Sequence, residues 1–512
     1  MRTLMEKPHP SADLAHLLSV ACGHVPLSMS ALPHARLLWI NARAAAHDPQ
    51  FWRFDGDWHA YSQHVLAQCA FALPMNAELA GAKVTAYADR YGGVGIGSNG
   101  GSGRAAYVNG YYVKGIGATP LVGKKSDRVH STGHCELQEC IREAVLSECI
   151  DVEFPWGAVP VLAIIGTGVY ENRIVEAGLD VGQHKTQTMG SEQTELCLLV
   201  RPTFLRPAHF DRAANFLSNL PKQGYQDALR VRAMGQACKK AWGVAEFKRV
   251  LKQLHVRWAE QLAYGYVHRF CHGAPSPSNV ALDGRLLDFG ATSTLPSWAR
   301  AHTVFGGPAT GQELPVMIKA LQSMLKQLAH QCPDLGIQAV DMQAMAQAAA
   351  QQYAQSMPVE LMRVLGLTRA QAHQAMACDD DRTIRRGLNR LLMHYAVEYF
   401  NTFEVTPKLR IAWQLADFWT GGLDTVAPGL RDQLAHVCGL GESTQNSSAM
   451  SQVLQRNDHR AMTRPMLFRE NLRHAIDKAV KDLQQAGQLA HGGLDAFIQG
   501  QVKANALMQE VD

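Results

Sequence analysis

The chain has 512 residues, of which 47% are hydrophobic and 18% are charged, a composition typical of a globular protein too long for one small core. Its formal net charge of +4 is too small to indicate nucleic-acid or membrane binding. Eleven cysteines, an odd number without a Cys-x-x-Cys pair, fit a reducing compartment. The first residues lack a signal peptide's apolar segment, and the most apolar run, 158–165, is too short to cross a bilayer. We therefore expect a soluble cytoplasmic protein of two lobes that binds neither nucleic acid nor membrane.

The first 80 residues have a mixed pattern, with candidate helices at Ala12–Val20 and Ala60–Leu73. We expect residues 1–80 to form an N-terminal extension. Glycine then dominates residues 87–120, where two β-rich segments flank Asn109-Gly110. Asn-Gly favours the positive φ angles of a tight hairpin turn, so the pattern predicts strand, turn and strand.

The following segment changes from strand to helix. Apolar residues at helical spacing predict a helix at Glu136–Ile150, and two apolar strands are expected at Ala158–Gly166 and Glu195–Arg201. Beyond that the pattern is mostly helical. The sequence therefore predicts a strand-rich lobe over residues 81–204 and a helical lobe over residues 205–512.

Three segments of the helical lobe have patterns of their own. Val280–Leu282 and Arg285–Leu287 are joined by Asp283-Gly284, which predicts a short hairpin. The polar, turn-rich segment Gly441–Ser448 predicts a loop. Met466–Gln485 is expected to be the final amphipathic helix.

A cluster of soft ligands lies near the predicted strand-to-helix junction: His134, Cys135, Cys140 and Cys149. Such residues could bind zinc, but their spacing matches no common zinc site. We interpret them as ordinary structural residues.

Phosphate chemistry is indicated by three features of the strand-rich lobe. A glycine-rich loop, residues 97–103, precedes Arg104, and its exposed amides could approach phosphate oxygens. Lys114 follows on a predicted strand, and Glu143 on the next predicted helix could orient its ammonium group.

The second half adds a candidate metal pair. The segment His272–Asn279 is followed, nine residues after Asn279, by Asp288. In kinase-like folds an Asn and a downstream Asp on adjoining loops hold Mg²⁺ against a nucleotide triphosphate. The carboxylate that usually deprotonates a hydroxyl nucleophile is missing, because Ala274 and Ser278 stand where it could be.

Six blocks of sequence, in order, resemble the selenoprotein O (SelO) family, kinase-fold enzymes that transfer AMP to proteins. The family motifs GDGRA, KGAGxTPxS, SSIREYLxSEAM, RVAPSFxRFGxFE, HGVLNTDN and IDYG have as counterparts here GSGRA (101–105), KGIGATP (114–120), ECIREAVLSECI (139–150), VRPTFLRPAHF (200–210), HGAPSPSN (272–279) and LDFG (287–290). Residues 464–472 also resemble the family's NPxxxLRNxL segment. The resemblance covers roughly residues 85–485 and implies an α+β, protein-kinase-like fold with a small strand-rich N-lobe and a large helical C-lobe.

The resemblance assigns a role to individual residues. The direct matches to family positions are Lys114, Glu143, Arg206, Asn279 and Asp288. It implies a site for ATP with Mg²⁺ or Mn²⁺, in which Asn279 and Asp288 bind the metal. The residues expected to contact the nucleotide are Gly101, Gly103, Arg104, Lys114, Arg201 and Arg206. Lys114, Glu143 and Ser278 are the expected catalytic positions.

The chain departs from the family at several positions. The family's other phosphate arginine falls at Leu199, although Arg201 would face the same side of a strand. The family's second GDG has Asp127 as its nearest counterpart. The family's catalytic Asp corresponds to Ser278.

Three hypotheses fit a nucleotide site without a base. The chain could be a pseudoenzyme that binds ATP as a structural ligand or serves as a scaffold for a partner protein. It could transfer AMP to a protein hydroxyl, with His272 or Asp283 as the base. It could instead act on a carboxylate, which is already ionised at pH 7 and needs no base. The product would then be an acyl-adenylate.

The third hypothesis agrees with a branch of the same family. In length the chain resembles the MchC-like proteins of microcin maturation, which are implicated in modifying the C-terminal residue of a peptide. This resemblance implies a protein or peptide substrate and an acyltransferase-like partner protein.

Overall fold

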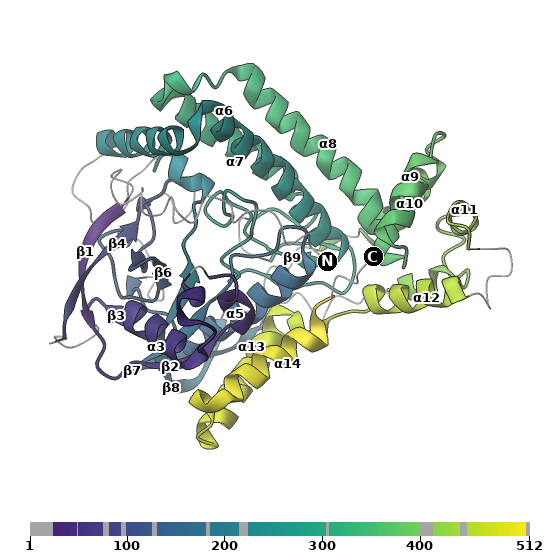
Figure 1. The fold of residues 1–512 in the computed structure, drawn as a ribbon. Helices are drawn as coiled ribbons and strands as arrows, with labels where there is room; N and C mark the ends of the chain where they lie inside the picture. Colours follow the sequence, from purple (N-terminus) through teal and green to yellow (C-terminus); the bar gives the residue numbers. More distant parts are fainter. Residues whose placement is uncertain are drawn as a thin grey trace.

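The structure is a computed structural model that describes residues 24–507 except for 49, 75–80, 94–98, 125–130, 181–184, 214–223, 304–306, 397, 400–412 and 441–447. It is an α+β protein with a sheet-rich N-terminal part and a helical C-terminal part. In Figure 1 the strands group on one side, and α6, α7 and α8 run along the top of the molecule. The candidate helix at 12–20, the loop at 441–447 and Asp127 lie outside the described residues.

One sheet of eight strands forms the N-terminal part, in the order β2-β7-β8-β6-β5-β4-β1-β3. Every neighbouring pair in it is antiparallel. The strands are β1 (His24–Ala31), β2 (Arg36–Ile40), β3 (Phe71–Ala72), β4 (Lys83–Asp89), β5 (Ala105–Val108), β6 (Tyr111–Lys114), β7 (Ala163–Asp180) and β8 (Lys185–Pro202). Three of them, β1, β2 and β3, come from the range expected to be an extension, so this range contributes to the same sheet.

The predicted hairpin at Asn109-Gly110 is confirmed. β5 pairs with β6 in the register Val108↔Tyr111. Asn109 and Gly110 have φ angles of 47° and 87°, as a two-residue turn between twisted strands requires. This register places Lys114 opposite Ala105, at the end of the hairpin nearest the glycine-rich loop.

The helices of the N-terminal part were predicted with small errors. α3 (Trp58–Cys69) ends before the expected residue 73, because Phe71 and Ala72 form β3 beside β1. α5 (Leu137–Glu153) confirms the predicted helix. A short helix, α2 (Ala42–Ala45), begins after Asn41, whose side chain accepts a hydrogen bond from the Ala44 amide.

The expected strand Ala158–Gly166 begins five residues later, at Ala163. Pro160 has no amide hydrogen for a sheet, and Val159 instead donates to the carbonyl of Leu286 (2.8 Å). β7 and β8 also continue well beyond their expected range as a long ribbon. Its outer residues mix polar side chains with Ile174, Val175 and Leu179 without regular alternation, so no hydrophobic pattern marked them as strands.

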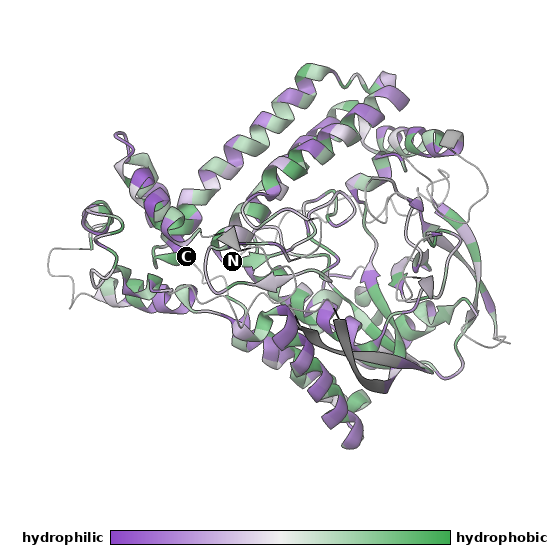
Figure 2. Cartoon of the chain, turned by 180° about the vertical axis from the view of Figure 1, so that it is seen from behind, coloured by the Kyte–Doolittle hydropathy of each residue, from purple (hydrophilic) through white to green (hydrophobic). Residues whose placement is uncertain are grey.

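The C-terminal part consists mainly of helices. They are α6 (Gly224–Val267), α7 (Glu313–Gln331), α8 (Ala339–Val364), α9 (Arg369–Ala377), α10 (Thr383–Tyr395), α11 (Leu430–Val437), α12 (Ser448–Ala461), α13 (Arg469–Gln485) and α14 (Leu494–Asn505). Two short pairs of strands accompany them: β9 (Phe270–Cys271) with β10 (Ser293–Thr294), and β11 (Arg300–Ala301) with β12 (Glu398–Tyr399). Figure 2 shows hydrophilic and hydrophobic residues alternating along the long helices, as expected when one face packs on a core.

Two expectations for this part need correction. The hairpin at 280–287 keeps its turn, with the Ala281 amide donating to the carbonyl of Arg285 (2.8 Å), but its strands reduce to the single bridge Val280↔Leu286. The helix expected to be the last, α13, is followed by α14. The glycines between them, Gly487, Gly492 and Gly493, interrupt the helical pattern of the sequence.

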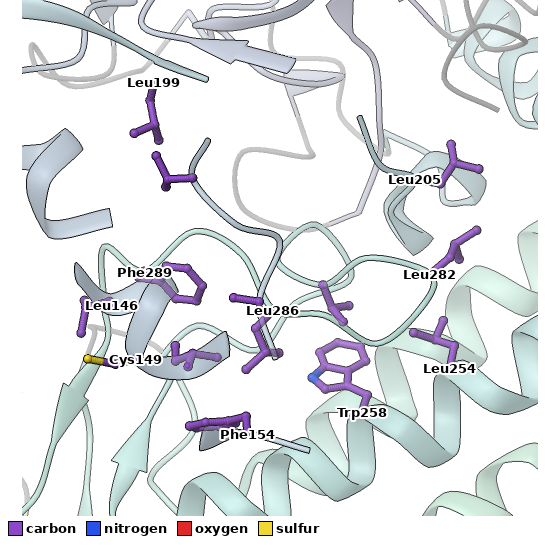
Figure 3. Close-up of a cluster of buried hydrophobic side chains, with 14 of the residues drawn as sticks. Leu146, Cys149, Phe154, Leu199, Leu205, Leu254, Trp258, Leu282, Leu286 and Phe289 are labelled. Carbon is purple, nitrogen blue, oxygen red and sulfur yellow. The ribbon is translucent and has the colours of Figure 1, made fainter. Parts of the chain in front are cut away.

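A continuous apolar core connects the two parts. It joins side chains of α5, β8 and α6 to the segment 282–289. Figure 3 shows Leu146 and Cys149 of α5, Leu199 of β8 and Trp258 of α6 around Leu286 and Phe289. The residue after Asp288 is therefore anchored in this core, which fixes where the Asp288 side chain begins.

None of the described helices is both long enough and apolar enough to span a membrane.

Candidate functional site

A pocket of about 700 Å³, including its open mouth, lies between the sheet and the segment 287–288. It is lined by Tyr91, Asn99, Ser102, Gly103, Arg104, Ala105, Tyr112, Lys114, Leu121, Val122, Gly123, Glu143, Arg201, Arg206, Leu287 and Asp288. The pocket brings together most of the residues expected to bind a nucleotide.

Lys114 lies between two carboxylates of α5. Its Nζ is 3.6 Å from Oε1 of Glu143, the expected ion pair, and 2.9 Å from Oε1 of Glu139. Burial and the Arg104 cation would lower the pKa of Lys114, but Glu139, Glu143 and Asp288 raise it overall. Glu139 was not expected, although its place one helical turn before Glu143 puts both carboxylates on one face of the helix.

Arg104 binds the same unexpected carboxylate with both of its terminal nitrogens. The two distances to Glu139 are 2.9 and 3.0 Å. Burial would raise the pKa of Glu139, but Arg104 and Lys114 outweigh this and hold it well below its ordinary value. Glu139 is therefore an anion at any physiological pH.

Glu143 is the better buried of the two carboxylates, with its side chain 2% exposed. It accepts hydrogen bonds from Arg201 (2.7 Å) and from the backbone amide of Phe289 (3.1 Å). Arg201, expected to contact phosphate, lines the pocket but also donates to the carbonyl of Val159. Its guanidinium therefore holds Glu143, and Glu143 connects Lys114 to the residue that follows Asp288.

Arg206 links the sheet to the segment His272–Asn279. It donates to the carbonyl of Ser278 (2.7 Å) and to the hydroxyl of Tyr112 (3.0 Å), and it pairs with Asp89 (3.1 Å). Its guanidinium also lies over the ring of Tyr91, 4.6 Å from the centroid. Asp89 also hydrogen-bonds His209 (2.6 Å). The side chains of this charged cluster are buried, so their contacts hold Arg206 firmly at the pocket wall.

The two expected glycines differ in position. Gly103 lines the pocket, whereas Gly101 lies behind it with φ of 144°. A Cβ added at Gly101 would stand 2.1 Å from the carbonyl oxygen of Asp89, so another residue would push the loop away from β4. Gly97 and Ser98 of the expected loop lie outside the described residues.

Asp288 contributes a carboxylate to the pocket from a left-handed backbone with φ of 63°. Burial would raise its pKa, but Lys114 and Arg104 lower it overall. No described residue donates a hydrogen bond to its oxygens. An ionised carboxylate with available oxygens at a pocket wall fits Mg²⁺, which binds proteins through one or two carboxylates and takes other ligands from phosphate and water.

Asn279 and Ser278, the other residues of the expected centre, do not line this pocket. The Asn279 side chain donates to the carbonyl of Ala274 (3.0 Å), and its backbone carbonyl accepts from Leu287 (3.1 Å). Asn279 is thus adjacent to the Asp288 segment, but its carboxamide faces its own loop. The Ser278 hydroxyl contacts that of Ser276 (2.7 Å).

Both candidate replacement bases are engaged elsewhere. Nδ1 of His272 accepts the amide hydrogen of Ala274 (3.3 Å), and Nε2 is 3.0 Å from the carbonyl of Leu287. These contacts require a neutral ring protonated at Nε2, and burial lowers the pKa of His272 in agreement. Asp283 binds Arg285 (2.8 Å) within the turn and does not line the pocket.

A second cavity of about 520 Å³, including its open mouth, lies on the other side of the segment 286–288. Its wall is largely apolar and includes Trp258, Leu286, His272, Asn279 and Glu313. Burial raises the pKa of Glu313 to about 7. This cavity was not predicted, since its residues come from segments far apart in the sequence.

The candidate zinc residues are separated in the structure. Cys135 and Cys140 touch within the core, with their sulfurs 3.3 Å apart, while His134 pairs with Glu171 (2.9 Å). Within the described ranges, no three His, Cys, Asp or Glu side chains are placed to hold a metal ion together.

Neither a comparison with protein-family models nor a search of curated proteins finds a match to the chain.

Proposed function

We propose that the chain is a SelO-like, kinase-fold nucleotidyltransferase that uses Mg-ATP and transfers AMP to a carboxylate, namely the C-terminus of a peptide. The observation that carries this proposal is the pocket itself. It combines the cations Arg104, Lys114 and Arg206 with one carboxylate, Asp288, whose oxygens accept no hydrogen bond from described residues.

The charge distribution supports a triphosphate ligand. Arginine and lysine side chains at the wall could neutralise phosphate oxygens, and Asp288 would hold a magnesium ion that supplies further positive charge. Mg²⁺, when bound, would offset negative charge on the phosphates as the bond to pyrophosphate breaks. The buried Glu143 would keep Lys114 directed at the same region.

Among the described residues no free base lines the pocket, and this supports a carboxylate as the acceptor. Among described residues, the carboxylates lining the pocket are Glu143, which is bound to Lys114 and Arg201, and Asp288, the candidate metal ligand. His272 and Asp283 are engaged elsewhere. A hydroxyl acceptor would lose the 10²–10⁴-fold contribution typical of a general base, whereas a carboxylate at pH 7 has no proton to lose.

The proposed reaction conserves atoms and charge without a base. One carboxylate oxygen attacks the α-phosphorus of ATP, the bond to the β-phosphate oxygen breaks, and pyrophosphate leaves. The product is an acyl-adenylate, which an amine or hydroxyl nucleophile could attack in a following step. We infer that such a step involves an acyltransferase-like partner protein.

Product analysis tests the proposal. The protein is incubated with Mg-ATP and a set of short synthetic peptides, each supplied with a free C-terminal carboxylate and, as the matched control, with a C-terminal amide. We expect pyrophosphate only from free carboxylates. Accumulation of ADP would favour phosphate transfer, stable AMP on Ser, Thr or Tyr would favour ordinary protein AMPylation, and no turnover would favour a pseudoenzyme.

A further inference from the structure

Glu139 holds the two pocket cations that could bind phosphate. Its Oε1 is 2.9 Å from Nζ of Lys114 and 2.9 Å from a terminal nitrogen of Arg104, and its Oε2 binds the other terminal nitrogen of Arg104 at 3.0 Å. A carboxylate that is bidentate to an arginine and shared with a lysine makes the same contacts to these cations that a phosphate ligand could make.

Glu139 differs from Glu143 in how firmly it is held. The Glu143 side chain is 2% exposed and is tied to Lys114, to Arg201 and to the Phe289 amide. The Glu139 side chain is 28% exposed and is bound by Lys114 and Arg104 alone among described residues. Its place in the first turn of α5 favours a carboxylate whichever way the side chain turns, because the helix N-terminus carries partial positive charge.

The charges in and beside the pocket balance without a ligand. Four cations are matched by four anions, a net charge of 4 − 4 = 0: Arg104, Lys114, Arg201 and Arg206 with Asp89, Glu139, Glu143 and Asp288. A polyphosphate entering this pocket therefore meets cations that are already paired with carboxylates. Two of these anions, Glu139 and Glu143, bind Arg104 or Lys114, and Glu139 is the more exposed of the two.

We propose that Glu139, which lies beside the pocket and not in its wall, is a resident anion that competes with phosphate for Arg104 and Lys114 and turns away when a polyphosphate binds. This inference deepens the proposed function and rests on it for the identity of the ligand. Glu139 then sets the affinity and the selectivity of the site. Strongly charged polyphosphates displace it, singly charged anions do not, and its return helps pyrophosphate to leave.

The test is binding of magnesium tripolyphosphate and of magnesium pyrophosphate, measured by calorimetry without any acceptor. Removing a competing anion leaves both cations for the ligand, so Glu139→Gln should bind at least about fivefold more tightly than the natural protein, as expected for a partly exposed ion pair. Glu143→Gln should bind more weakly, because Lys114 loses its fixed partner. Asp151→Asn, on the same helix outside the pocket, is the matched control and should bind like the natural protein.

Thermal unfolding gives a second readout, because the shift in Tm caused by the ligand can be compared between variants of different intrinsic stability. Tripolyphosphate should raise the Tm of Glu139→Gln more than that of the natural protein, since at a given concentration a ligand that binds more tightly stabilises the folded state more. Glu139→Ala should behave in the same way if Glu139→Gln is poorly folded.

Equal or weaker polyphosphate binding by both Glu139 variants would overturn the inference. If the natural protein binds too weakly to measure, binding gained in Glu139→Gln supports the inference and continued absence of binding overturns it. Because no acceptor is present, a failure to detect AMP transfer would count against the proposed function alone.

Discussion

The two cavities on either side of the segment 286–288 place carboxylates in opposite environments. In the charged pocket, Asp288 lies near Lys114 and Arg104, and these cations lower its pKa in spite of burial. In the apolar cavity, Glu313 is also buried, but no described cation is within ion-pair distance, and its pKa rises to about 7. Burial alone therefore does not decide the charge of a carboxylate; its partners do.

This difference has a chemical consequence. A carboxylate that stays ionised can hold a metal ion, whereas one that titrates near neutrality could exchange protons. Glu313 lines a cavity whose wall includes Arg269, but the two side chains form no ion pair, whereas Asp288 lines the pocket that holds Lys114 and Arg104. The charged pocket is thus suited to binding and orienting phosphate rather than to removing a proton.

The largest expected effect is that of Asp288→Asn. It removes the carboxylate that, among the described residues, is available to a metal ion in the charged pocket, so Mg-dependent ATP binding and turnover should fall by about 100-fold or more. Equilibrium binding with and without Mg²⁺ measures the change. The matched control is Asp283→Asn in the adjoining turn, and equal losses in both variants would contradict the assignment.

A somewhat smaller loss is expected for Glu143→Gln. The variant weakens the ties to Lys114 and Arg201 and leaves Arg201 buried without its anion, which should reduce the free energy of unfolding by about 3 kcal/mol. ATP affinity should fall by roughly tenfold, because Lys114 is no longer fixed. Chemical denaturation and nucleotide binding measure the two effects, and unchanged stability would show that the ion pair is not buried.

The apolar cavity makes a prediction about pH. Glu313 binds a proton in the folded state up to about pH 7 but loses it in the unfolded state above its ordinary value of 4.5. Stability should therefore fall as pH rises through this interval, by roughly 2–3 kcal/mol in all. Glu313→Gln should lack this fall, so the variant's stability relative to the natural protein increases from pH 4.5 to 7. Parallel pH profiles of the two proteins would show that Glu313 is not desolvated.

The smallest effect is expected for Ser278→Ala. The Ser278 hydroxyl contacts Ser276, and Arg206 binds the Ser278 carbonyl, which the substitution retains. Turnover should fall less than tenfold, whereas loss of a true base would cost about 100-fold or more. A large loss in kcat with unchanged ATP binding would identify Ser278 as part of the chemistry.

The sequence predicted well those features that depend on local pattern. The turn at Asn109-Gly110 and the helix α5 follow from turn chemistry and helical periodicity. The Lys114–Glu143 ion pair was also predicted, from the order of short motifs. Contacts that depend on packing were not predicted. Glu139, for example, had no sequence feature that set it apart from other charged helix residues as a partner of Lys114 and Arg104.

Interactions between distant segments could not be predicted from the sequence either. Nothing local indicates that Arg201 turns to Glu143, or that the Asn279 carboxamide faces Ala274. The outer part of the β7–β8 ribbon has no regular apolar alternation in its sequence, so the pattern of residues could not mark it as strand.

The most direct test of the central claim follows oxygen from the acceptor. Peptides whose C-terminal carboxylates carry ¹⁸O are incubated with the protein, Mg-ATP and hydroxylamine, which attacks the carbonyl carbon of an acyl-adenylate. The carboxylate oxygen bonded to phosphorus then leaves with AMP, so the account predicts AMP that contains ¹⁸O together with a peptide hydroxamate. AMP without the label, or ADP in its place, would contradict activation of a carboxylate.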